Sequence, residues 1–145
     1  MTTVSDILRS KPAGAVHTIG PAAPVVDALR LMAQKNIGAL VVVDNEAIVG
    51  IVSERDCARK VTLMNRSPAD TPLRDIMSTS VMVVRPEYSS EQCMALMTEH
   101  RLRHLPVVQG GTLLGIVSIG DLVKDIISDQ KFVIDQMAHY ISGEP

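Results

Sequence analysis

Two short stretches of the chain pair a hydroxyl with a carboxylate at a spacing that could do chemistry. "GIVSERD" begins at residue 50, and "GIVSIGD" begins 65 positions later. Each places a serine three residues before an aspartate, Ser53 before Asp56 and Ser118 before Asp121. The spacing is close to that of a capping box, in which the serine starts a helix and the acidic side chain reaches back to it. A capping box alone is therefore one interpretation of the repeated stretch.

Ligand binding is the second interpretation, and it adds to the first. A capping box prefers the longer Glu or Gln, whereas both copies use Asp. The N-terminus of a helix offers unpaired N–H groups and the positive end of a dipole, which suit a phosphate. A carboxylate one turn into the helix can accept hydrogen bonds from two vicinal hydroxyls, as an acidic residue does on the ribose in dinucleotide folds. The stretch therefore favours a ribose phosphate as ligand.

Other chemistries find little support in the residues. His100 and His104 have the i, i+4 spacing of a metal site, but Pro106 and a predicted strand follow so closely that the two should not share a helix face. Cys57 and Cys93 are isolated in apolar surroundings, which is typical of free thiols in a reducing compartment. The sequence has no dinucleotide fingerprint, P-loop, nucleophile elbow or cysteine–histidine dyad signature. We expect neither a metal site nor a catalytic residue.

The elements that hold the two stretches come from a duplication. Residues 16–60 align with residues 81–125 without a gap, and 12 of the 45 positions are identical. Further upstream, "VSDIL" at residue 4 is similar to "LRDIM" at residue 73. Two units of this size bury more apolar surface together than either does alone. We divide the chain into repeat 1 at residues 1–67, repeat 2 at residues 68–127 and a C-terminal helical extension at residues 128–145.

Each repeat is predicted to run strand, helix, strand, strand, helix. Short β-branched runs, "AVHTI" and "SVMVV", precede helical stripes in "VVDALRLMAQKN" and "SEQCMALMTEH". Two apolar runs follow, divided by a polar turn at residues 44–46 in repeat 1 and 109–111 in repeat 2, and the last helix starts at the Ser–Asp pair. The expected fold class is α+β, with the repeats related by a pseudo-twofold axis and packed sheet to sheet. Clefts between the repeats are then the expected ligand sites.

Composition and charge narrow the class of protein. The 145 residues are 46% hydrophobic but only 2% aromatic, so the core is expected to be aliphatic. The net charge of −2 argues against a nucleic-acid surface. No apolar run reaches the roughly 18 residues of a spanning helix, and "MTTVSDILRSK" lacks the pattern of a signal peptide. These features predict a cytoplasmic protein with no membrane or nucleic-acid partner.

With glycine, hydroxyl and aspartate in register in both copies, the chain resembles a tandem pair of cystathionine-β-synthase (CBS) domains, a stand-alone Bateman module. The resemblance covers about residues 4–127 and implies a β-α-β-β-α unit in each half. It implies an adenosine ligand between the repeats: AMP, ADP, ATP, NAD or S-adenosylmethionine. It also implies that Asp56 and Asp121 bind the ribose hydroxyls and that Ser53 and Ser118 lie by the ribose or phosphate. The residues that it places around the adenine are Thr18, Ile19, Ala39, Leu40 and Val41 in repeat 1, and Val83, Val84, Leu105, Pro106 and Val107 in repeat 2.

The two repeats differ in charge beside the expected ligand. Repeat 2 has Arg101, Arg103 and His104 before its second strand, where repeat 1 has Asn, Gly and Ala. Basic residues at this place in the family reach ligand phosphates, and Arg55 in repeat 1 is a further phosphate candidate. One site is therefore expected to prefer a phosphorylated ligand, and the other a less charged adenosine end. A solvated basic edge is the alternative.

The chain is predicted to continue as a helix over residues 122–141. Its apolar stripe consists of Ile126, Ile127, Val133, Ile134, Met137, Tyr140 and Ile141. The stripe could fold back on its own domain or form a contact between two copies. The resemblance favours the second alternative, because paired CBS modules commonly form flat dimers.

We interpret the chain as a non-enzymatic sensor that binds AMP or NAD, forms a homodimer and acts on a separate effector protein. No catalytic cofactor is expected. Three alternatives remain open at this point: a ligand-independent interaction module with vestigial clefts, a binder of S-adenosylmethionine, and an enzyme acting on a nucleotide.

Overall fold

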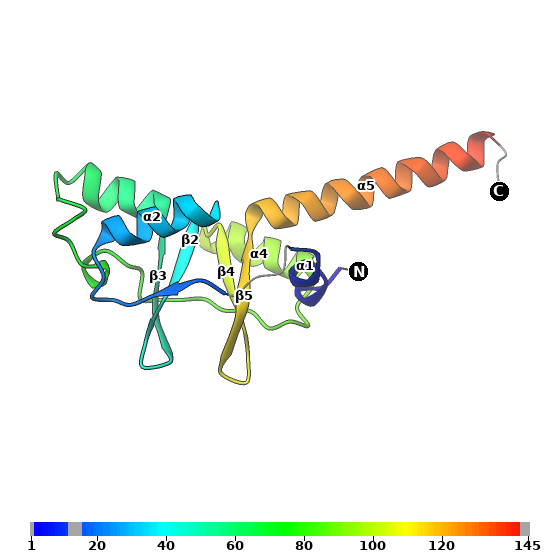
Figure 1. Ribbon diagram of the computed structural model, residues 1–145. Coiled ribbons are helices and arrows are strands. Elements are labelled where there is room, and N and C mark those ends of the chain that lie inside the picture. The colour runs from blue at the N-terminus through cyan, green and yellow to red at the C-terminus, as the bar shows by residue number, and fades with distance from the viewer. Residues whose placement is uncertain (1, 12–15, 143–145) are drawn as a thin grey trace. The chain divides into compact units, whose positions relative to one another are not determined.

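The computed structural model describes residues 2–11 and 16–142, which form two compact units (Figure 1). The first-repeat unit runs from Ala15 to Met82, and the second-repeat unit combines the chain up to Gly14 with the chain from Val83 onward. Each unit contains one small sheet and several helices, three strands in the first and two in the second. The predicted α+β class is therefore confirmed.

The first-repeat unit follows the predicted order of elements. Its strand β1 pairs in parallel with β2, and β2 pairs antiparallel with β3. The turn between β2 and β3 places Asn45 and Glu46 at positive φ, as a tight hairpin requires. Ala15, which the prediction included in the first strand, lies outside the described residues. The elements are β1 (Thr18–Ile19), α2 (Val25–Lys35), β2 (Ala39–Asp44), β3 (Ala47–Ser53), α3 (Glu54–Cys57), a π-helical turn (Ala58–Thr62) and a 3-10 helix (Leu73–Asp75).

The core of this unit lies between α2 and one face of the sheet. Leu40 and Val42 of β2 pack there with Met32 of α2. Because side chains alternate along a strand, Ala39 and Val41 lie on the other face of β2, and both are also buried. The predicted "adenine" residues of β2 are thus divided between two faces, and the side chain of Leu40 belongs to the core.

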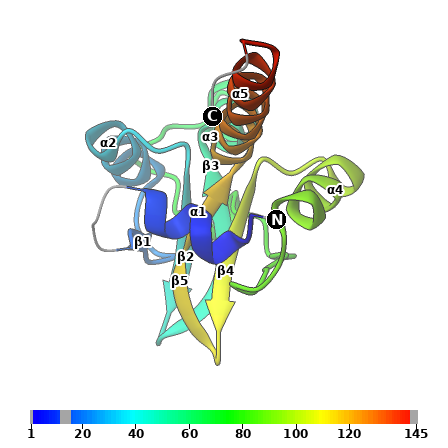
Figure 2. The same ribbon diagram turned by 90° about the vertical axis from the view of Figure 1, so that its right-hand side faces the viewer.

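The second-repeat unit repeats the hairpin but not the first strand. The β4–β5 pair has the same register as β2–β3, with His104 opposite Ser118 as Ala39 is opposite Ser53. Figure 2 shows this hairpin with α1 beside β5. The elements are α1 (Val4–Ser10), α4 (Ser90–His100), β4 (His104–Gln109), β5 (Thr112–Ser118) and α5 (Ile119–Ser142).

The strand predicted at "SVMVV" is wrong, because only one residue of it pairs. Val84 bridges to Val107, donating its N–H to the Pro106 carbonyl at 2.9 Å and accepting from the Val108 N–H at 2.9 Å. Pro106 stands where β2 has Val41 and has no N–H with which to extend the ladder. Val83 is 42% exposed.

The glycine of each repeated stretch is explained by close packing. A Cβ atom on Gly50 would lie 2.6 Å from Met77 Sδ and 3.0 Å from the Ser78 carbonyl oxygen. A Cβ atom on Gly115 would lie 3.0 Å from Leu8 Cδ2. Leu8 and Met77 end the similar segments "VSDIL" and "LRDIM", so equivalent residues cover equivalent glycines.

This packing exchanges the segments between the repeats. The helix α1 precedes repeat 1 in sequence but packs in the second-repeat unit, whereas the 3-10 helix after residue 68 packs in the first-repeat unit. The boundary at residues 67 and 68 therefore stays a prediction about the duplication, and the compact units do not follow it.

The last helix, α5, continues past the second Ser–Asp pair as one element. In Figure 1 its second half extends away from α1, α4, β4 and β5 of its own unit. Every side chain from residue 127 to 139 is exposed, so the fold-back alternative is wrong for these residues. Tyr140 and Ile141 of the predicted stripe lie outside the described side chains. Among residues 2–11 and 16–142, no helix has both the length and the apolar character needed to cross a membrane.

Candidate functional site: two Ser–Asp boxes

The first Ser–Asp box joins β3 to α3. Ser53 has extended backbone angles, which turn its hydroxyl toward the start of the helix and let it accept from the Asp56 N–H at 3.1 Å. In return Asp56 Oδ2 accepts from the Ser53 N–H at 3.0 Å and from the Ser53 hydroxyl at 3.1 Å. The capping interpretation is confirmed here, so any ligand role is additional to it.

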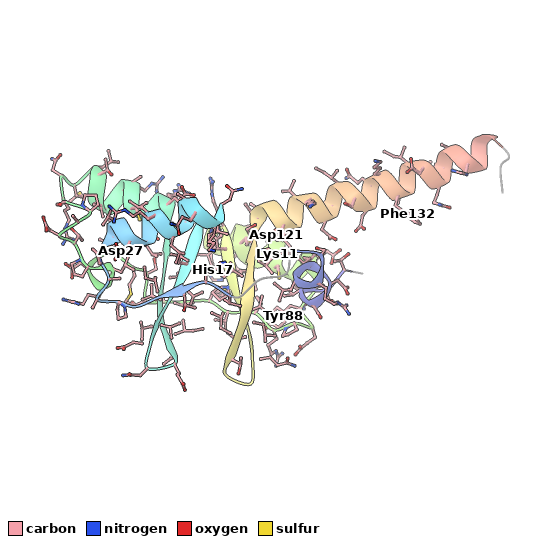
Figure 3. All side chains as sticks on the ribbon, in the orientation of Figure 1. Lys11, His17, Asp27, Tyr88, Asp121 and Phe132 are labelled. Atoms are coloured by element: carbon pink, nitrogen blue, oxygen red, sulfur yellow. The ribbon has the colours of Figure 1, made fainter. Side chains whose placement is uncertain are left out.

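The second Ser–Asp box joins β5 to α5 and has an added partner. Asp121 Oδ2 accepts from the Ser118 N–H at 2.9 Å, and the Asp121 N–H donates to Ser118 Oγ at 3.1 Å. Lys11 Nζ donates to the same Oδ2 at 2.9 Å and to the Ile116 carbonyl at 2.9 Å, and Figure 3 shows Lys11 beside Asp121. Sequence reasoning missed Lys11, because a partner 110 residues away leaves no local pattern.

The surroundings of Asp121 keep it ionised. Burial acts to raise the pKa of this carboxyl, but hydrogen bonds from Ser118 and the ammonium of Lys11 outweigh burial and lower the pKa below its usual value. Asp121 is therefore a carboxylate at neutral pH, held by one amide and one ammonium group.

Two further capping boxes, at the starts of α1 and α4, show which features a capping box has outside the repeated stretch. Ser89 and Gln92 form one at the start of α4. In the other, Asp6 Oδ2 accepts from the Thr3 N–H at 3.0 Å at the start of α1. Asp therefore closes a capping box in this chain outside the repeated stretch, and its presence in place of Glu or Gln is no evidence for a ligand.

In both Asp56 and Asp121 the capping hydrogen bonds use Oδ2 and do not use Oδ1. Oδ1 of Asp56 lies 3.6 Å from Lys60 Nζ. Oδ1 of Asp121 takes no hydrogen bond from the described part of the chain. The prediction was that both carboxylate oxygens accept hydrogen bonds from the two ribose hydroxyls. Because the cap occupies Oδ2, Oδ1 would have to accept from both hydroxyls with its two lone pairs. The side chains of Asp56 and Asp121 are 22% and 21% exposed, so a small molecule can reach both.

Of the other residues predicted in repeat 1, Ala39 and Arg55 lie beside the first box, whereas Thr18 and Ile19 lie across β2 from it. Thr18 of β1 is the register partner of Val41, and Ala39 is the register partner of Ser53. Within the sheet, the start of β2 therefore lies beside the box, whereas β1 pairs with the opposite edge of β2. Thr18 and Arg55 are exposed, and Ile19 is half-buried.

In the second-repeat unit, two of the three predicted basic residues lie beside the box. His104 is the register partner of Ser118, and the Arg103 carbonyl accepts from the Ile119 N–H at 2.8 Å. Arg101 is exposed and ends α4 in the left-handed conformation, with φ 56°. Val84, Leu105 and Pro106 are buried.

The described residues do not gather into a metal site. His100 ends α4 and His104 begins β4, so the two lie on different elements. No cluster of three or more His, Cys, Asp or Glu side chains that could hold a metal ion occurs among the described residues.

Comparisons with known proteins agree with this architecture. The sequence profile of the CBS domain matches residues 4–62 and 73–128. The CBS domain-containing protein CBSX3, mitochondrial, of Arabidopsis thaliana is 37% identical over 150 residues, which cover 98% of this chain and 73% of that protein.

Solved structures share the fold over most of the chain. A protein with CBS domains from Burkholderia ambifaria MC40-6 has a TM-score of 0.85 and 54% identity, over 89% of this chain and 96% of that one. The hexameric CBS-CP12 protein from bloom-forming cyanobacteria has a TM-score of 0.76 and 30% identity, over 97% and 87%. CBSX2 in complex with AMP has a TM-score of 0.71 and 28% identity, over 88% and 98%. Taken with the two Ser–Asp boxes and the repeated hairpins, these matches show that the chain belongs to the CBS domain family and consists of two CBS domains in tandem.

Proposed function

We propose that this pair of CBS domains is a non-enzymatic regulatory module that binds an adenine nucleotide, AMP or NAD. The observation that carries the proposal is the AMP complex of CBSX2, which shares the fold over 88% of this chain. In our proposal Asp56 and Asp121 accept hydrogen bonds from the ribose hydroxyls of the ligand.

The two carboxylates support this role by their position and charge. Each is fixed by a capping box at the junction of a strand and a helix, with Oδ2 engaged and Oδ1 left for a ligand. A carboxylate oxygen is a strong acceptor for a hydroxyl, because the acceptor carries the charge. A fixed carboxylate also has little side-chain freedom to lose when the ribose binds.

In this proposal the other predicted residues contact the adenine base or bind the phosphate of the ligand. The base lies against β1 and the start of β2 in one unit, near Thr18, Ile19, Ala39 and Val41, and against Val83, Val84, Leu105 and Pro106 in the other. The phosphate is held by Arg103 and His104, which lie beside the Ser118 box, with Arg101 and Arg55 as further exposed donors.

Titration calorimetry with AMP tests the ribose assignment. We expect Asp56→Ala and Asp121→Ala each to weaken AMP binding at one site at least tenfold. Asp6→Ala is the matched control, because it removes an aspartate from a capping box of the same geometry outside the two Ser–Asp boxes. Binding that is the same in all four proteins would contradict the proposal, and the interaction module without a ligand would then be the better interpretation.

Comparing AMP with adenosine tests the phosphate assignment. Arg103→Ala should weaken AMP binding while leaving adenosine binding unchanged, because only AMP carries the phosphate. Equal affinity of the wild-type protein for AMP and adenosine at every site would remove the predicted difference between the repeats. Mass spectrometry of any nucleotide that copurifies would separate AMP, NAD and S-adenosylmethionine.

The proposal extends to catalysis, assembly and location. Incubation with AMP or NAD should give no turnover product. The chain should self-associate, and the hexameric CBS-CP12 protein is an assembly precedent with 30% identity. A cytoplasmic location stays a prediction, and the relative CBSX3 is named as mitochondrial. The effector that responds to the ligand is expected to be a separate protein.

A further inference from the structure

The lysine beside each Ser–Asp box stands at a different oxygen of the carboxylate. In the second-repeat unit, Lys11 Nζ donates at 2.9 Å to Asp121 Oδ2, the same oxygen that accepts from the Ser118 N–H (Figure 3). In the first-repeat unit, Lys60 Nζ lies 3.6 Å from Asp56 Oδ1, the oxygen that the cap does not use. The second box therefore keeps its lysine on the side of the cap, whereas the first box has its lysine at the oxygen left for a ligand.

Both lysines are also tied to the backbone of their own unit. Lys11 Nζ donates to the Ile116 carbonyl at 2.9 Å, and Lys60 Nζ donates to the Ile76 carbonyl at 2.9 Å. Each ammonium thus has one backbone acceptor and one aspartate beside it. The two lysines form a matched pair that differs in the carboxylate oxygen each one faces.

Helix α1 holds the backbone of Lys11 in place. Val4 of α1 is buried, and its N–H donates to the Tyr88 carbonyl at 2.8 Å. Leu8 packs against Gly115, and the Lys11 N–H donates to the Leu8 carbonyl at 3.3 Å. A side chain supported by a packed element holds a binding group more precisely than one on a free loop. Lys11 is therefore able to fix the carboxylate that it contacts.

The fixed carboxylate presents Oδ1 to a ligand in one direction. The Ser118 amide and the Lys11 ammonium come from different elements and converge on Oδ2 of Asp121, so a rotation that exchanged its two oxygens would break both hydrogen bonds. At Asp56, a ribose hydroxyl would instead share Oδ1 with the ammonium of Lys60. The two boxes are therefore unequal as acceptors for a diol.

We propose that Lys11 is a positioning residue for the ribose at the Asp121 site, because it holds Oδ2 and keeps Oδ1 for the two hydroxyls. The inference rests on the ribose role of Asp121 proposed above and deepens it by naming a residue that sets the selectivity of the site. Lys60 acts in the opposite sense, because its ammonium competes with the hydroxyls for Oδ1 of Asp56. The Asp121 site is then the more selective for a ribose with both hydroxyls.

The dissociation constant of 2′-deoxy-AMP divided by that of AMP measures this selectivity. The two ligands have the same base and phosphate and differ by one ribose hydroxyl, so a general change in charge or in the folded fraction leaves the ratio unchanged. Titration calorimetry in an Asp56→Ala background isolates the Asp121 site, and an Asp121→Ala background isolates the Asp56 site. We expect a ratio of about ten or more at the Asp121 site and a smaller one at the Asp56 site.

Substitutions on α1 and directly after it test the positioning role in the Asp56→Ala background. Lys11→Met should lower the ratio at the Asp121 site to about three or less, because the carboxylate loses its second donor. Lys11→Arg keeps a cation for Oδ2 and should retain most of the ratio. Arg9→Met is the matched control, because Arg9 pairs with Asp6 of the capping box of α1. It should leave the ratio unchanged.

The same substitution at Lys60 should act in the other direction. In the Asp121→Ala background, Lys60→Met should raise the ratio at the Asp56 site by up to about fivefold, the most that an exposed ion pair is worth. A ratio that falls in Lys60→Met as it does in Lys11→Met would overturn the proposed difference between the lysines.

The failures of this inference and of the proposed function are distinguishable. If Lys11→Met weakens AMP and 2′-deoxy-AMP by the same factor, Lys11 binds the phosphate or supports the fold, and its positioning role is overturned while the ribose assignment stands. A ratio near one at both sites before any lysine is changed would overturn the ribose assignment and the inference together.

Discussion

The two Ser–Asp boxes have the same internal hydrogen bonds but different outside partners. In the first-repeat unit, the Ile51 carbonyl accepts from the Ser78 N–H at 3.0 Å, so a second backbone segment closes the edge of β3. In the second-repeat unit, the equivalent carbonyl of Ile116 accepts from Lys11 Nζ at 2.9 Å. Among the described residues, the donor to this carbonyl is thus a backbone amide in the first-repeat unit and a charged side chain, which also holds Asp121, in the second.

The comparison shows which parts of a duplicated unit are kept. The strand end, the glycine and the capping box are local features that a repeat carries with it in sequence. Equivalent residues, Leu8 and Met77, cover the two glycines, but the donor to the strand-edge carbonyl differs: the Ser78 N–H in the first-repeat unit and Lys11 Nζ in the second. The first unit should therefore depend more on close backbone packing, and the second more on an ion pair.

Each unit contains one buried cysteine, so the reactivity of its thiol reports on the stability of that unit separately. Burial, with the nearby charges of Asp56 and Glu54, raises the pKa of Cys57 to about 11, and burial raises the pKa of Cys93. At pH 8 the thiolate of Cys57 should be about two orders of magnitude less abundant than that of a free cysteine with a pKa near 8.5. We expect Cys57 in a Cys93→Ala background to react at least 100-fold more slowly with a thiol reagent in the native state than in urea.

Cys93 in a Cys57→Ala background reports on the second unit in the same way. Native-state labelling as fast as labelling in urea would contradict the buried position of either thiol. The two backgrounds then show separately how each unit responds to a substitution.

We expect the largest difference in stability between the two units when the glycine of each repeated stretch, Gly50 or Gly115, is replaced by alanine. Gly50→Ala would bring a Cβ atom against both Met77 and the backbone oxygen of Ser78, whereas Gly115→Ala meets only the flexible end of Leu8. Overpacking of this kind costs about 1–3 kcal/mol, and we expect Gly50→Ala to lie near the upper end and Gly115→Ala near the lower end. Urea unfolding followed by thiol labelling measures both.

Shortening the covering side chain provides the control for this prediction. Leu8→Ala should relieve most of the cost of Gly115→Ala. Met77→Ala should relieve only part of the cost of Gly50→Ala, because the Ser78 backbone remains. Full relief in both cases would mean that the two glycines are equivalent.

Local patterns in the sequence predicted the repeated elements well. Helix α4 has the predicted bounds, Ser90–His100, because Ser89 caps its start and Arg101 ends it in the left-handed conformation. The hairpins follow from polar or glycine-rich turns between two apolar runs. The two capping boxes were also predicted from a three-residue spacing. These features depend on residues that are close together in the sequence.

Long-range features could not be predicted from these patterns. The packing of α1 in the second-repeat unit and the Lys11–Asp121 ion pair join residues about 100 positions apart. The loss of a first strand in repeat 2 has a local cause, the proline at residue 106, but its effect falls on Val84 in another segment. The ligand roles of Asp56 and Asp121 stay predictions, because the cap alone accounts for their positions.

Double-mutant cycles compare the ion pairs of the two boxes. Asp121→Asn with Lys11→Met should show a coupling energy of about 0.5–1 kcal/mol, because the two charges are 2.9 Å apart and partly exposed. Asp56→Asn with Lys60→Met should show almost none, since that pair is 3.6 Å apart. Asparagine keeps an oxygen for the capping box in both cases. Equal coupling energies at low salt would contradict the proposed difference between the units.

The smallest expected effect is a pH dependence of the stability of the second-repeat unit. The folded-state pKa of Asp121 is lowered, so its contribution to stability is fully present above the unfolded value of about 3.9 and is lost as the pH falls through the folded value. Asp6 in the same unit also has a lowered pKa, through its hydrogen bonds with Thr3 and Arg9, so Asp121→Asn should remove only part of the loss below pH 4. The midpoint of urea unfolding, measured from pH 7 to pH 3, follows this change. If the midpoint falls with pH as steeply in Asp121→Asn and in Asp6→Asn as in the wild-type protein, neither carboxylate is responsible.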